Sequence, residues 1–479
     1  MNALAQKINA LYDVSVPPPQ SGKLIYMNLK LTSEKFKQLR RHPNANLSAI
    51  EKIETWLIYS EPFQRLRMNP YEIAKWGELE LDDILPEFLN GVNIGLFKLY
   101  WNVHCPYCNM VTREFDDLRM ATASAYCEMC EKESEVDFLH HVEGVFSLSR
   151  DIEDLDLPPI SCPPPSIQKY FGLTAPYEST VSGEEVMPPG RYRYVCPLTH
   201  SKGVLTVEGK AAESGQILKL RQLEGRHFDP EEIKVRPGPL CFELTNTGHP
   251  ISSLQVYQDE LSEPLDFEQL PKRLTGFDLI HFPDYRRFFA NQVLSDREWF
   301  RIHCVTIMFV DIAYSTQRHG RFDDAKAYHS LCDYLAILFR NTHASGGIEI
   351  KTIGDAVMLS FRNTAAAIKA AIMANFDFQK YNQEKRSEEH IRIKVGIHKG
   401  PALLVSLNGK LDYFGRTVHE ASAIQKCSKS GELSFSEAVC QDASFKNILR
   451  EFGISTIETF EVVPRASGEK QKIFKIGLA

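Results

Sequence analysis

The feature that most constrains the fold of this chain is an apolar run that ends in a carboxylate. The run VTIMFVDI, residues 305–312, is almost unbroken in apolar residues, as is typical of a strand buried inside a sheet. A helical pattern follows, then two alternating strands in GIEIKTIGDAVMLSF that join at Gly354 and Asp355. A second helix and a strand in HIRIKVGIHKGPALLV complete the order βαββαβ. This order predicts a ferredoxin-like α+β unit over residues 301–479.

Two carboxylates are expected to meet at one edge of that unit. In the βαββαβ order the first strand lies antiparallel to the third, which brings Asp311 toward Asp355. Adjacent carboxylates repel each other unless a cation lies between them, and oxygen ligands favour Mg²⁺ or Mn²⁺. The following loop could hold a polyphosphate through its backbone amides, with Ile312, Ser315 and Thr316 as the candidate residues. The pattern favours a two-metal nucleotide site over two unrelated turn acids.

Four upstream cysteines form two CxxC pairs. CPYC holds Cys105 and Cys108, and CEMC holds Cys127 and Cys130 after 18 intervening residues. Each pair can direct two thiolates toward one point, and the loop between them allows a tetrahedral site to close. We therefore predict a zinc ribbon with a structural Zn²⁺ rather than four free thiols, since a closed four-sulfur site has no open position for catalysis.

The rest of the chain divides by composition. The first hundred residues read as mainly helical and resemble a winged helix, for which we favour a scaffold or dimerisation role, because ELELDDILPEF is acidic where DNA binding would require basic residues. DLPPISCPPPS is too proline-dense for a helix or sheet, and the short alternating runs after it are typical of a small β-sandwich. An aromatic-rich amphipathic helix is expected before the last domain.

The predicted domains are a helical region (1–100), the zinc ribbon (101–155), a proline-rich linker (156–186), the sandwich (187–265), a connector helix (276–300) and the C-terminal domain (301–479).

The overall composition narrows the classes of partner. The formal net charge of −7 gives no general reason to expect binding to nucleic acid or to an anionic membrane. The sequence has no apolar run of about 18 residues, and its N-terminus lacks the order of a signal peptide. We therefore expect a soluble cytoplasmic protein that binds neither membranes nor nucleic acid.

The motifs of the last 180 residues carry a resemblance to a known family. VTIMFVDIAYST, GIEIKTIGDAVMLSF, IKVGIHKGPAL and LDYFGRTVHEASAIQ closely resemble the class III adenylate and guanylate cyclase catalytic domain. A zinc ribbon and a β-rich module before such a domain look like a bacterial architecture of cyclase-domain proteins.

The resemblance implies a homodimer in which each active site is shared between two chains. One chain would supply the metal ligands Asp311 and Asp355, and the other would read the adenine edge through Lys351 and Asp412. The implied reaction converts ATP into cyclic AMP and pyrophosphate, with two Mg²⁺ or Mn²⁺ ions at each active site, in intracellular signalling.

Two positions depart from the family's pattern. On the helix after the turn glycine the family usually has an asparagine that orients the ribose and, four residues later, an arginine that stabilises charge on the phosphate. Here these positions hold His419 and Ala423. His419 could hold the ribose, and Lys410, Lys426 or Lys470 could supply positive charge, although the same residues also fit an ordinary solvated helix face. The alternative function is therefore a weak or inactive cyclase-like regulatory subunit that binds nucleotide or requires a complementary cyclase partner.

Overall fold

The computed structural model describes residues 27–60, 62–65, 67–127, 130–153, 169–176, 178–196, 201–223, 227–247, 251–258, 272–313, 324–462 and 471–478. The chain divides into two compact units. The first takes the residues up to Glu114 together with Ser124–Glu135 and Val145–Arg273. The second takes Phe115–Ala123, Val136–Gly144 and the chain from Leu274 onward. Among the described helices, none is long and apolar enough to span a membrane.

The first unit begins with helices that pack on a small sheet. The helices are α2 (Leu29–Leu39), α3 (Leu47–Tyr59), α4 (Pro62–Arg65), α5 (Pro70–Gly77) and α6 (Leu81–Asn93). The sheet has the order β2-β1-β5, with β1 at Phe97–His104, β2 at Val111–Phe115 and β5 at Val142–Leu148. Phe88 of α6 lies 4.8 Å from Phe97 and 4.9 Å from Phe146, measured between ring centroids. These ring contacts pack α6 against β1 and β5.

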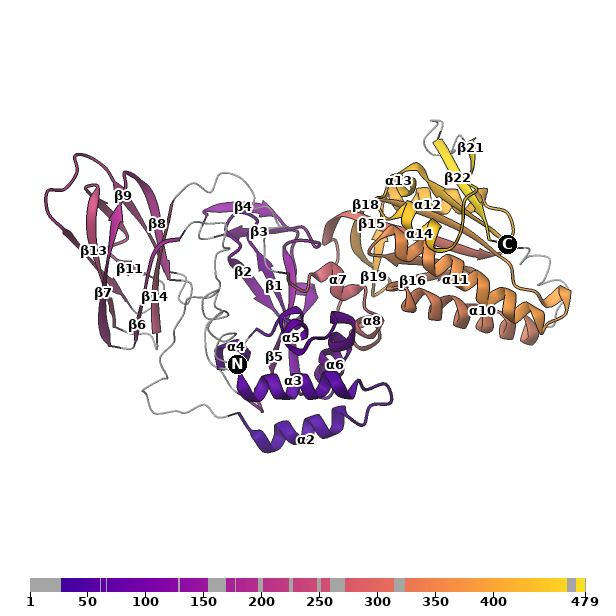
Figure 1. Cartoon of the computed structure of the whole chain (residues 1–479), viewed down its shortest axis with the longest axis horizontal. Coiled ribbons are helices and arrows are strands. Elements are labelled where there is room, and N and C mark those ends of the chain that lie inside the picture. Colours follow the sequence, from indigo (N-terminus) through magenta and orange to yellow (C-terminus); the bar gives the residue numbers. More distant parts are fainter. Residues whose placement is uncertain are drawn as a thin grey trace. The chain divides into compact units, whose positions relative to one another are not determined.

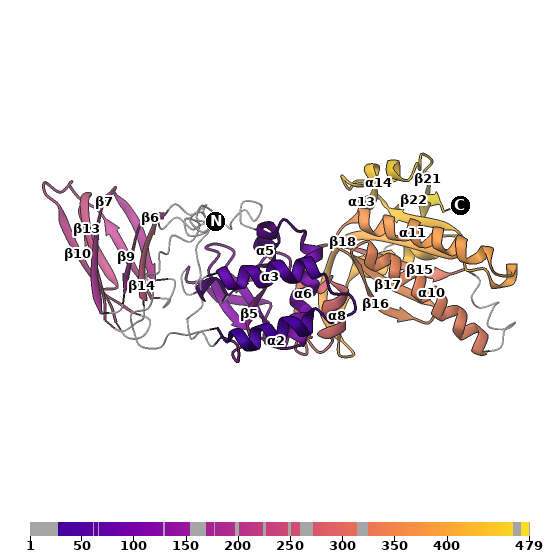
Figure 2. The same cartoon turned by 60° about the horizontal axis from the view of Figure 1, so that its bottom comes forward.

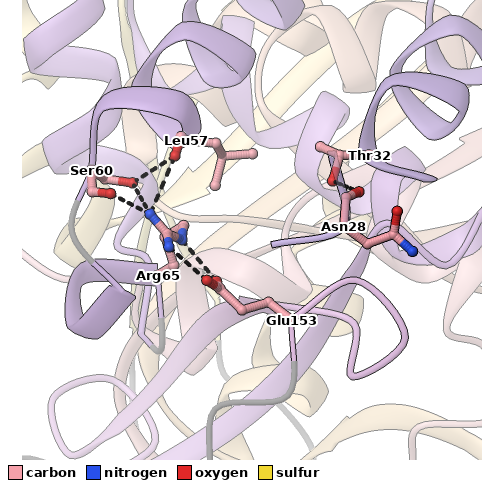
Figure 3. Close-up of polar contacts among 6 residues, drawn as sticks. All are labelled: Asn28, Thr32, Leu57, Ser60, Arg65 and Glu153. Carbon is pink, nitrogen blue, oxygen red and sulfur yellow. Dashed lines mark hydrogen bonds and ion pairs between the residues drawn. The ribbon is translucent and has the colours of Figure 1, made fainter. Parts of the chain in front are cut away.

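A buried ion pair joins α4 to the segment that follows β5. Figure 3 shows the Arg65 guanidinium against the Glu153 carboxylate, with Nε–Oε2 and Nη2–Oε1 distances of 2.7 and 2.6 Å. Arg65 also donates to the carbonyl oxygens of Leu57 and Ser60 at the end of α3. Because both charges are buried and well hydrogen-bonded, removing either partner would leave an uncompensated buried charge.

Strands β6 to β14 of the first unit form two sheets that share one apolar core. One sheet has the order β11-β10-β13-β7 and the other β12-β9-β8-β14-β6. Their bounds are β6 Lys169–Pro176, β7 Ser179–Met187, β8 Gly190–Cys196, β9 Ser201–Val207, β10 Gln216–Gln222, β11 Phe228–Asp229, β12 Glu232–Val235, β13 Gly238–Asn246 and β14 Ile251–Gln258.

The linker predicted at 156–186 is wrong in its second half. Residues 154–168, with most of the proline-rich stretch, lie outside the described residues, whereas 169–187 form β6 and β7. β7 is an edge strand that pairs with β13 along its whole length, and its alternate residues face solvent. The polar composition of these residues therefore resembles that of a linker, although they form a strand. The predicted limits of 187–265 are also wrong at the start, because the first described strand of this module begins at Lys169.

The second unit contains the predicted βαββαβ order. It runs β15 (Trp299–Ile312), α10 (Asp324–Ala344), β16 (Gly347–Ile353), β17 (Ala356–Phe361), α11 (Thr364–Gln383) and β18 (Ile393–Leu407). The sheet order is β16-β17-β15-β18-β20-β22-β21, with β15 antiparallel to β17 as predicted. The remaining elements are β19 (Lys410–Phe414), α12 (Arg416–Cys427), β20 (Glu432–Ser436), α13 (Glu437–Cys440), α14 (Phe445–Glu451), β21 (Glu458–Val462) and β22 (Gln471–Gly477).

Helices cover both faces of this sheet. α10 and α11 lie side by side in Figures 1 and 2 and bury the apolar side chains of one face, including Val395 and Ile397 of β18. α12 packs on β18 from the other face, where Gly396 leaves no room for a side chain: a Cβ there would lie 2.2 Å from the Gln425 nitrogen. This contact fixes the helix that carries His419.

The connector predicted as one helix over 276–300 is wrong. Two short helices, α7 (Gly276–Ile280) and α8 (Pro283–Phe288), are followed by irregular chain, and β15 already begins at Trp299. Pro283 lies in the first turn of α8, where its missing N–H is tolerated, so it starts a new helix instead of continuing α7. Residues 299–303 alternate between exposed and buried, which is the period of a strand.

Candidate functional site

Asp311 lies near the end of β15, opposite Lys394 of β18. Its Oδ2 atom is 2.9 Å from the Lys394 ammonium and accepts a hydrogen bond of 3.4 Å from the Gln425 amide of α12. Both partners were missed from the sequence. Lys394 alternates with buried isoleucine and valine residues and so belongs to the opposite face of its strand, but the strand register that brings it to Asp311 is not visible in the sequence.

Asp355 lies in the turn between β16 and β17, where Gly354 adopts a φ of 66°. The register places Val310 opposite Val357, which brings the turn to the end of β15. Burial of Tyr334 raises the pKa of its hydroxyl well above the ordinary value, and the charges of Asp311 and Asp355 add to this shift. The charges of both carboxylates therefore act on one buried tyrosine hydroxyl.

The Asp355 carboxylate is suited to hold a cation. Its Oδ2 atom is buried and has no hydrogen-bond partner among the described residues. An unpaired buried carboxylate oxygen is costly, and a bound divalent cation would remove that cost. The donor set of two aspartates fits Mg²⁺ or Mn²⁺, with Lys394 occupying part of the same electrostatic environment.

Lys351 and Asp412 lie together, on β16 and β19. The Lys351 ammonium is 2.6 Å from Asp412 Oδ2, and the Asp412 side chain is only 9% exposed. The other carboxylate oxygen, Oδ1, accepts a 2.7 Å hydrogen bond from the Tyr413 backbone N–H. The pair is thus a cation and an anion held at one point by two different strands.

The helix α12 leaves its candidate residues open to solvent. His419 is exposed, and its ring meets that of Phe414 edge-on with centroids 6.4 Å apart. Lys426 and Lys410 are also exposed, and neither has an ion-pair partner among the described residues. No contact brings these two lysines to the aspartates or to Lys351.

Four further predicted residues have mixed outcomes. The Ile312 side chain is 6% exposed and belongs to the apolar core, so only its backbone is available for binding. Ser315, Thr316 and Lys470 lie outside the described residues.

The four cysteines of the two CxxC pairs form one buried cluster. Cys105 and Cys108 lie in the turn between β1 and β2, and Cys127 and Cys130 flank the turn between β3 (Ser124–Cys127) and β4 (Lys132–Glu135). The Cys105–Cys130 and Cys108–Cys127 sulfur distances are 3.8 and 3.6 Å, and all four sulfur atoms lie within 4.8 Å of one another. Tetrahedral zinc with Zn–S bonds of about 2.3 Å would separate its ligands by about 3.8 Å.

The electrostatics of this cluster also fit a cation. Contact with the Cys105 thiol, with the other two thiols and burial adding to it, raises the pKa of Cys108 well above its ordinary value. Four thiolates in such a buried space would repel one another, and a divalent metal would remove that repulsion. The cluster can therefore hold a metal ion.

Comparison with known proteins assigns the C-terminal part of the chain. Residues 298–474 match the family model of the adenylate and guanylate cyclase catalytic domain. This segment is a cyclase catalytic domain. The match begins at the start of β15 and includes Asp311, Asp355, Lys351 and Asp412. We refer to it below as the cyclase domain.

The chain is also similar to individual proteins of other organisms. An adenylate cyclase of Anabaena cylindrica is 28% identical over 203 residues, which cover 39% of this chain and 40% of that protein. An uncharacterized protein of Mycobacterium tuberculosis is 24% identical over 228 residues, covering 47% of this chain and 55% of its own. The chain thus spans about half or less of the length of these relatives. Among solved structures, the adenylyl cyclase CyaB from P. aeruginosa covers 37% of this chain and 95% of its own, with 19% identity and a TM-score of 0.31.

The N-terminal part matches a second family model. Residues 30–157 correspond to DUF5939, a family of unknown function. This one match spans both the helices α2 to α6 and the four-cysteine cluster. The sequence prediction divided the same region into a helical domain and a separate ribbon.

Proposed function

We propose that this protein is a nucleotide cyclase that converts ATP into cyclic AMP and pyrophosphate at a site completed by a second copy of the chain. The observation that carries the proposal is the placement of Asp311 near the end of β15 and of Asp355 in the turn before β17, the strand that pairs with β15, within the cyclase domain. The pair Lys351 and Asp412, which would contact the nucleotide base, supports ATP as the preferred nucleotide.

In this mechanism Asp311 and Asp355 would hold two Mg²⁺ or Mn²⁺ ions. When bound, these ions activate the ribose 3′-hydroxyl and neutralise charge on the phosphates. Lys394 would exchange its contact with Asp311 for a phosphate oxygen. Lys351 would donate to a ring nitrogen of adenine, and Asp412 would accept from the exocyclic amine. The 3′-hydroxyl oxygen would then form its bond to the α-phosphorus and release its proton to solvent, as the bond from that phosphorus to pyrophosphate breaks.

Exposed apolar residues beside the site favour a homodimer. Ile353, between Lys351 and Asp355 in sequence, is 53% exposed, and Phe414, two residues after Asp412, is 54% exposed. Large exposed apolar side chains next to functional residues are typical of an interface. A second chain would cover them and bring its own aspartates to the Lys351–Asp412 pair.

The four-cysteine cluster is proposed to hold a structural Zn²⁺. Its sulfur distances match a tetrahedral site, and all four positions are filled by protein ligands. Such a site supplies folding free energy and takes no part in the chemistry.

The test of the proposed activity is product identification by mass after incubation with ATP, GTP, CTP or UTP and Mn²⁺. We expect cyclic AMP as the main product. Asp355→Asn should reduce turnover at least hundredfold, because it removes a ligand charge and keeps the side-chain shape. Asp377→Asn is the matched control, since Asp377 pairs with Arg340 and Asn341 on the surface of α10 and α11. Equal rates for wild type and Asp355→Asn would contradict the proposal.

A second candidate function is a regulatory subunit that binds nucleotide and turns it over slowly. Ala423 favours it, because a methyl group cannot stabilise charge on a reacting phosphate. In that case the purified chain would bind ATP and form little product alone, and a cyclase partner with the asparagine and arginine would restore turnover.

A further inference from the structure

The strand β19, which carries Asp412, is bonded to another strand on one side only. Among the described strands it pairs with β18 alone, over Lys410–Phe414. The Asp412 carboxylate is oriented by the backbone of that strand, because its Oδ1 atom accepts from the Tyr413 N–H. The unpaired side of an edge strand leaves backbone N–H and C=O groups open to bonds from other parts of the molecule, and such bonds help to set the direction of the carboxylate.

Arg286 of α8 holds that edge. Its Nη1 atom donates to the Leu411 carbonyl at 3.1 Å, one residue before Asp412, and its Nε atom donates to the Ile280 carbonyl at 3.3 Å. The guanidinium therefore joins β19 to the end of α7. The residue as a whole is partly exposed, but its Nη2 atom is buried and has no hydrogen-bond partner among the described residues.

The charge of Arg286 also reaches the Lys351–Asp412 pair. Burial lowers the pKa of Arg286, and the nearby acids Glu349 and Asp412 oppose this shift. The guanidinium is thus within electrostatic range of the Asp412 carboxylate. A fixed positive charge near the carboxylate attracts it and so helps to hold it in place.

The segment that carries Arg286 is itself fixed to the sheet. His281, 1% exposed, contacts the Phe277 carbonyl at 2.7 Å through Nδ1 and the Ser360 hydroxyl of β17 at 2.9 Å through Nε2. Farther along, the Leu294 N–H donates to the Ser406 hydroxyl of β18 at 2.7 Å. The segment that carries Arg286 is therefore bonded to the sheet both before and after this residue.

We propose that Arg286 is a positioning residue for base selection, which holds β19 so that Asp412 faces the exocyclic amine of a 6-aminopurine. The inference rests on the proposed function, in which Asp412 reads the base. A 6-oxopurine such as guanine presents a carbonyl at that point, which an ionised carboxylate repels. Without Arg286 the carboxylate would lose its orientation, and the preference for ATP over GTP would fall.

The test compares Arg286→Met, Arg286→Lys and wild type, with Arg287→Met as the matched control. Arg287 is exposed on the same helix, stacked on Phe288, and its loss removes an identical group from outside the site. We would measure KM and kcat with ATP and GTP, and equilibrium binding of both nucleotides in Ca²⁺, which permits binding without relying on turnover.

For Arg286→Met we expect KM for ATP to rise about tenfold with little change in KM for GTP, the range for one charged hydrogen bond. Arg286→Lys should fall in between, and Arg287→Met should match wild type. Equal losses for ATP and GTP, or a kcat loss alone, would overturn the proposal, because that is the result of a purely structural role. If wild type binds ATP over GTP without turnover, the cyclase proposal fails while the binding ratio still tests Arg286. If wild type shows no preference for ATP in binding, both proposals fail.

Discussion

At the residue scale, the composition of α12 decides how fast the proposed reaction can run. His419 and Ala423 stand where the cyclase family usually has an asparagine and an arginine, and both lie on an exposed or partly exposed part of the helix. His419 contacts Phe414, and no described contact brings it to the aspartates. α12 therefore presents neither the asparagine nor the arginine that the family usually has at these positions.

Restoring the usual pair should raise the rate. In the double variant His419→Asn, Ala423→Arg we expect kcat to increase about a hundredfold, since one preorganised donor at the transition state contributes about 3 kcal/mol. The helix should tolerate the change, because arginine has nearly the helix propensity of alanine. The measurement is the initial rate of cyclic AMP formation, with Ser422→Arg as a control that adds the same charge one position away. An unchanged rate would indicate that other residues already provide this stabilisation.

At the element scale, the packing of α12 against β18 links the fold to the site. Gln425 of α12 contacts Asp311, and the same residue lies directly over Gly396. A side chain at residue 396 would meet backbone atoms of α12, which cannot move aside as a flexible side chain can.

Gly396→Ala should therefore destabilise the cyclase domain by about 1–3 kcal/mol, the usual cost of overpacking. Peptides covering β18 and α12 should exchange backbone hydrogen for deuterium faster, and activity should fall. Gly477→Ala on β22 is the control, because nothing lies within 4 Å of a Cβ built there. Exchange rates in Gly396→Ala equal to those of the control would show that the helix adapts without cost.

The sequence predicted the elements of the cyclase domain better than their contacts. The apolar run of β15 and the Gly354–Asp355 turn are local signals, so the strand order could be inferred from them. The Asp311–Lys394 pair depends on the register of two strands 80 residues apart, and the Arg286–Leu411 contact depends on how a connector folds back. β7 was missed because an edge strand carries polar residues that resemble those of a linker. Local pattern thus gave the elements, while long-range register determined the contacts of the site.

At the scale of the whole molecule, two loops that lie close in sequence to the four cluster cysteines belong to the compact unit that contains the cyclase domain. They are Phe115–Ala123 and Val136–Gly144, and they alternate along the chain with the segments that carry the cysteines. The Leu118 N–H donates to the Gln292 side chain at 2.7 Å. Asp137 lies 3.1 Å from His303, and the Phe138 ring lies 5.3 Å from that of Phe300.

Loss of the metal should therefore increase the hydrogen–deuterium exchange of the segment that leads into β15. Without a metal, the thiolates in the segments before the first loop and between the two loops would repel one another, and the loops would lose this support for their contacts with Gln292 and His303. We expect Cys127→Ser to lose one bound zinc per chain by elemental analysis, and to exchange deuterium faster both in residues 136–144 and in residues 292–303. Cys241→Ser, at a cysteine of β13 far from the cluster in sequence, should keep the metal and the wild-type exchange. Zinc retained in Cys127→Ser would refute the metal site. Zinc lost with unchanged exchange at 292–303 would refute the effect of the metal on that segment. The contacts of Leu118, Asp137 and Phe138 would then hold without any support from the cluster.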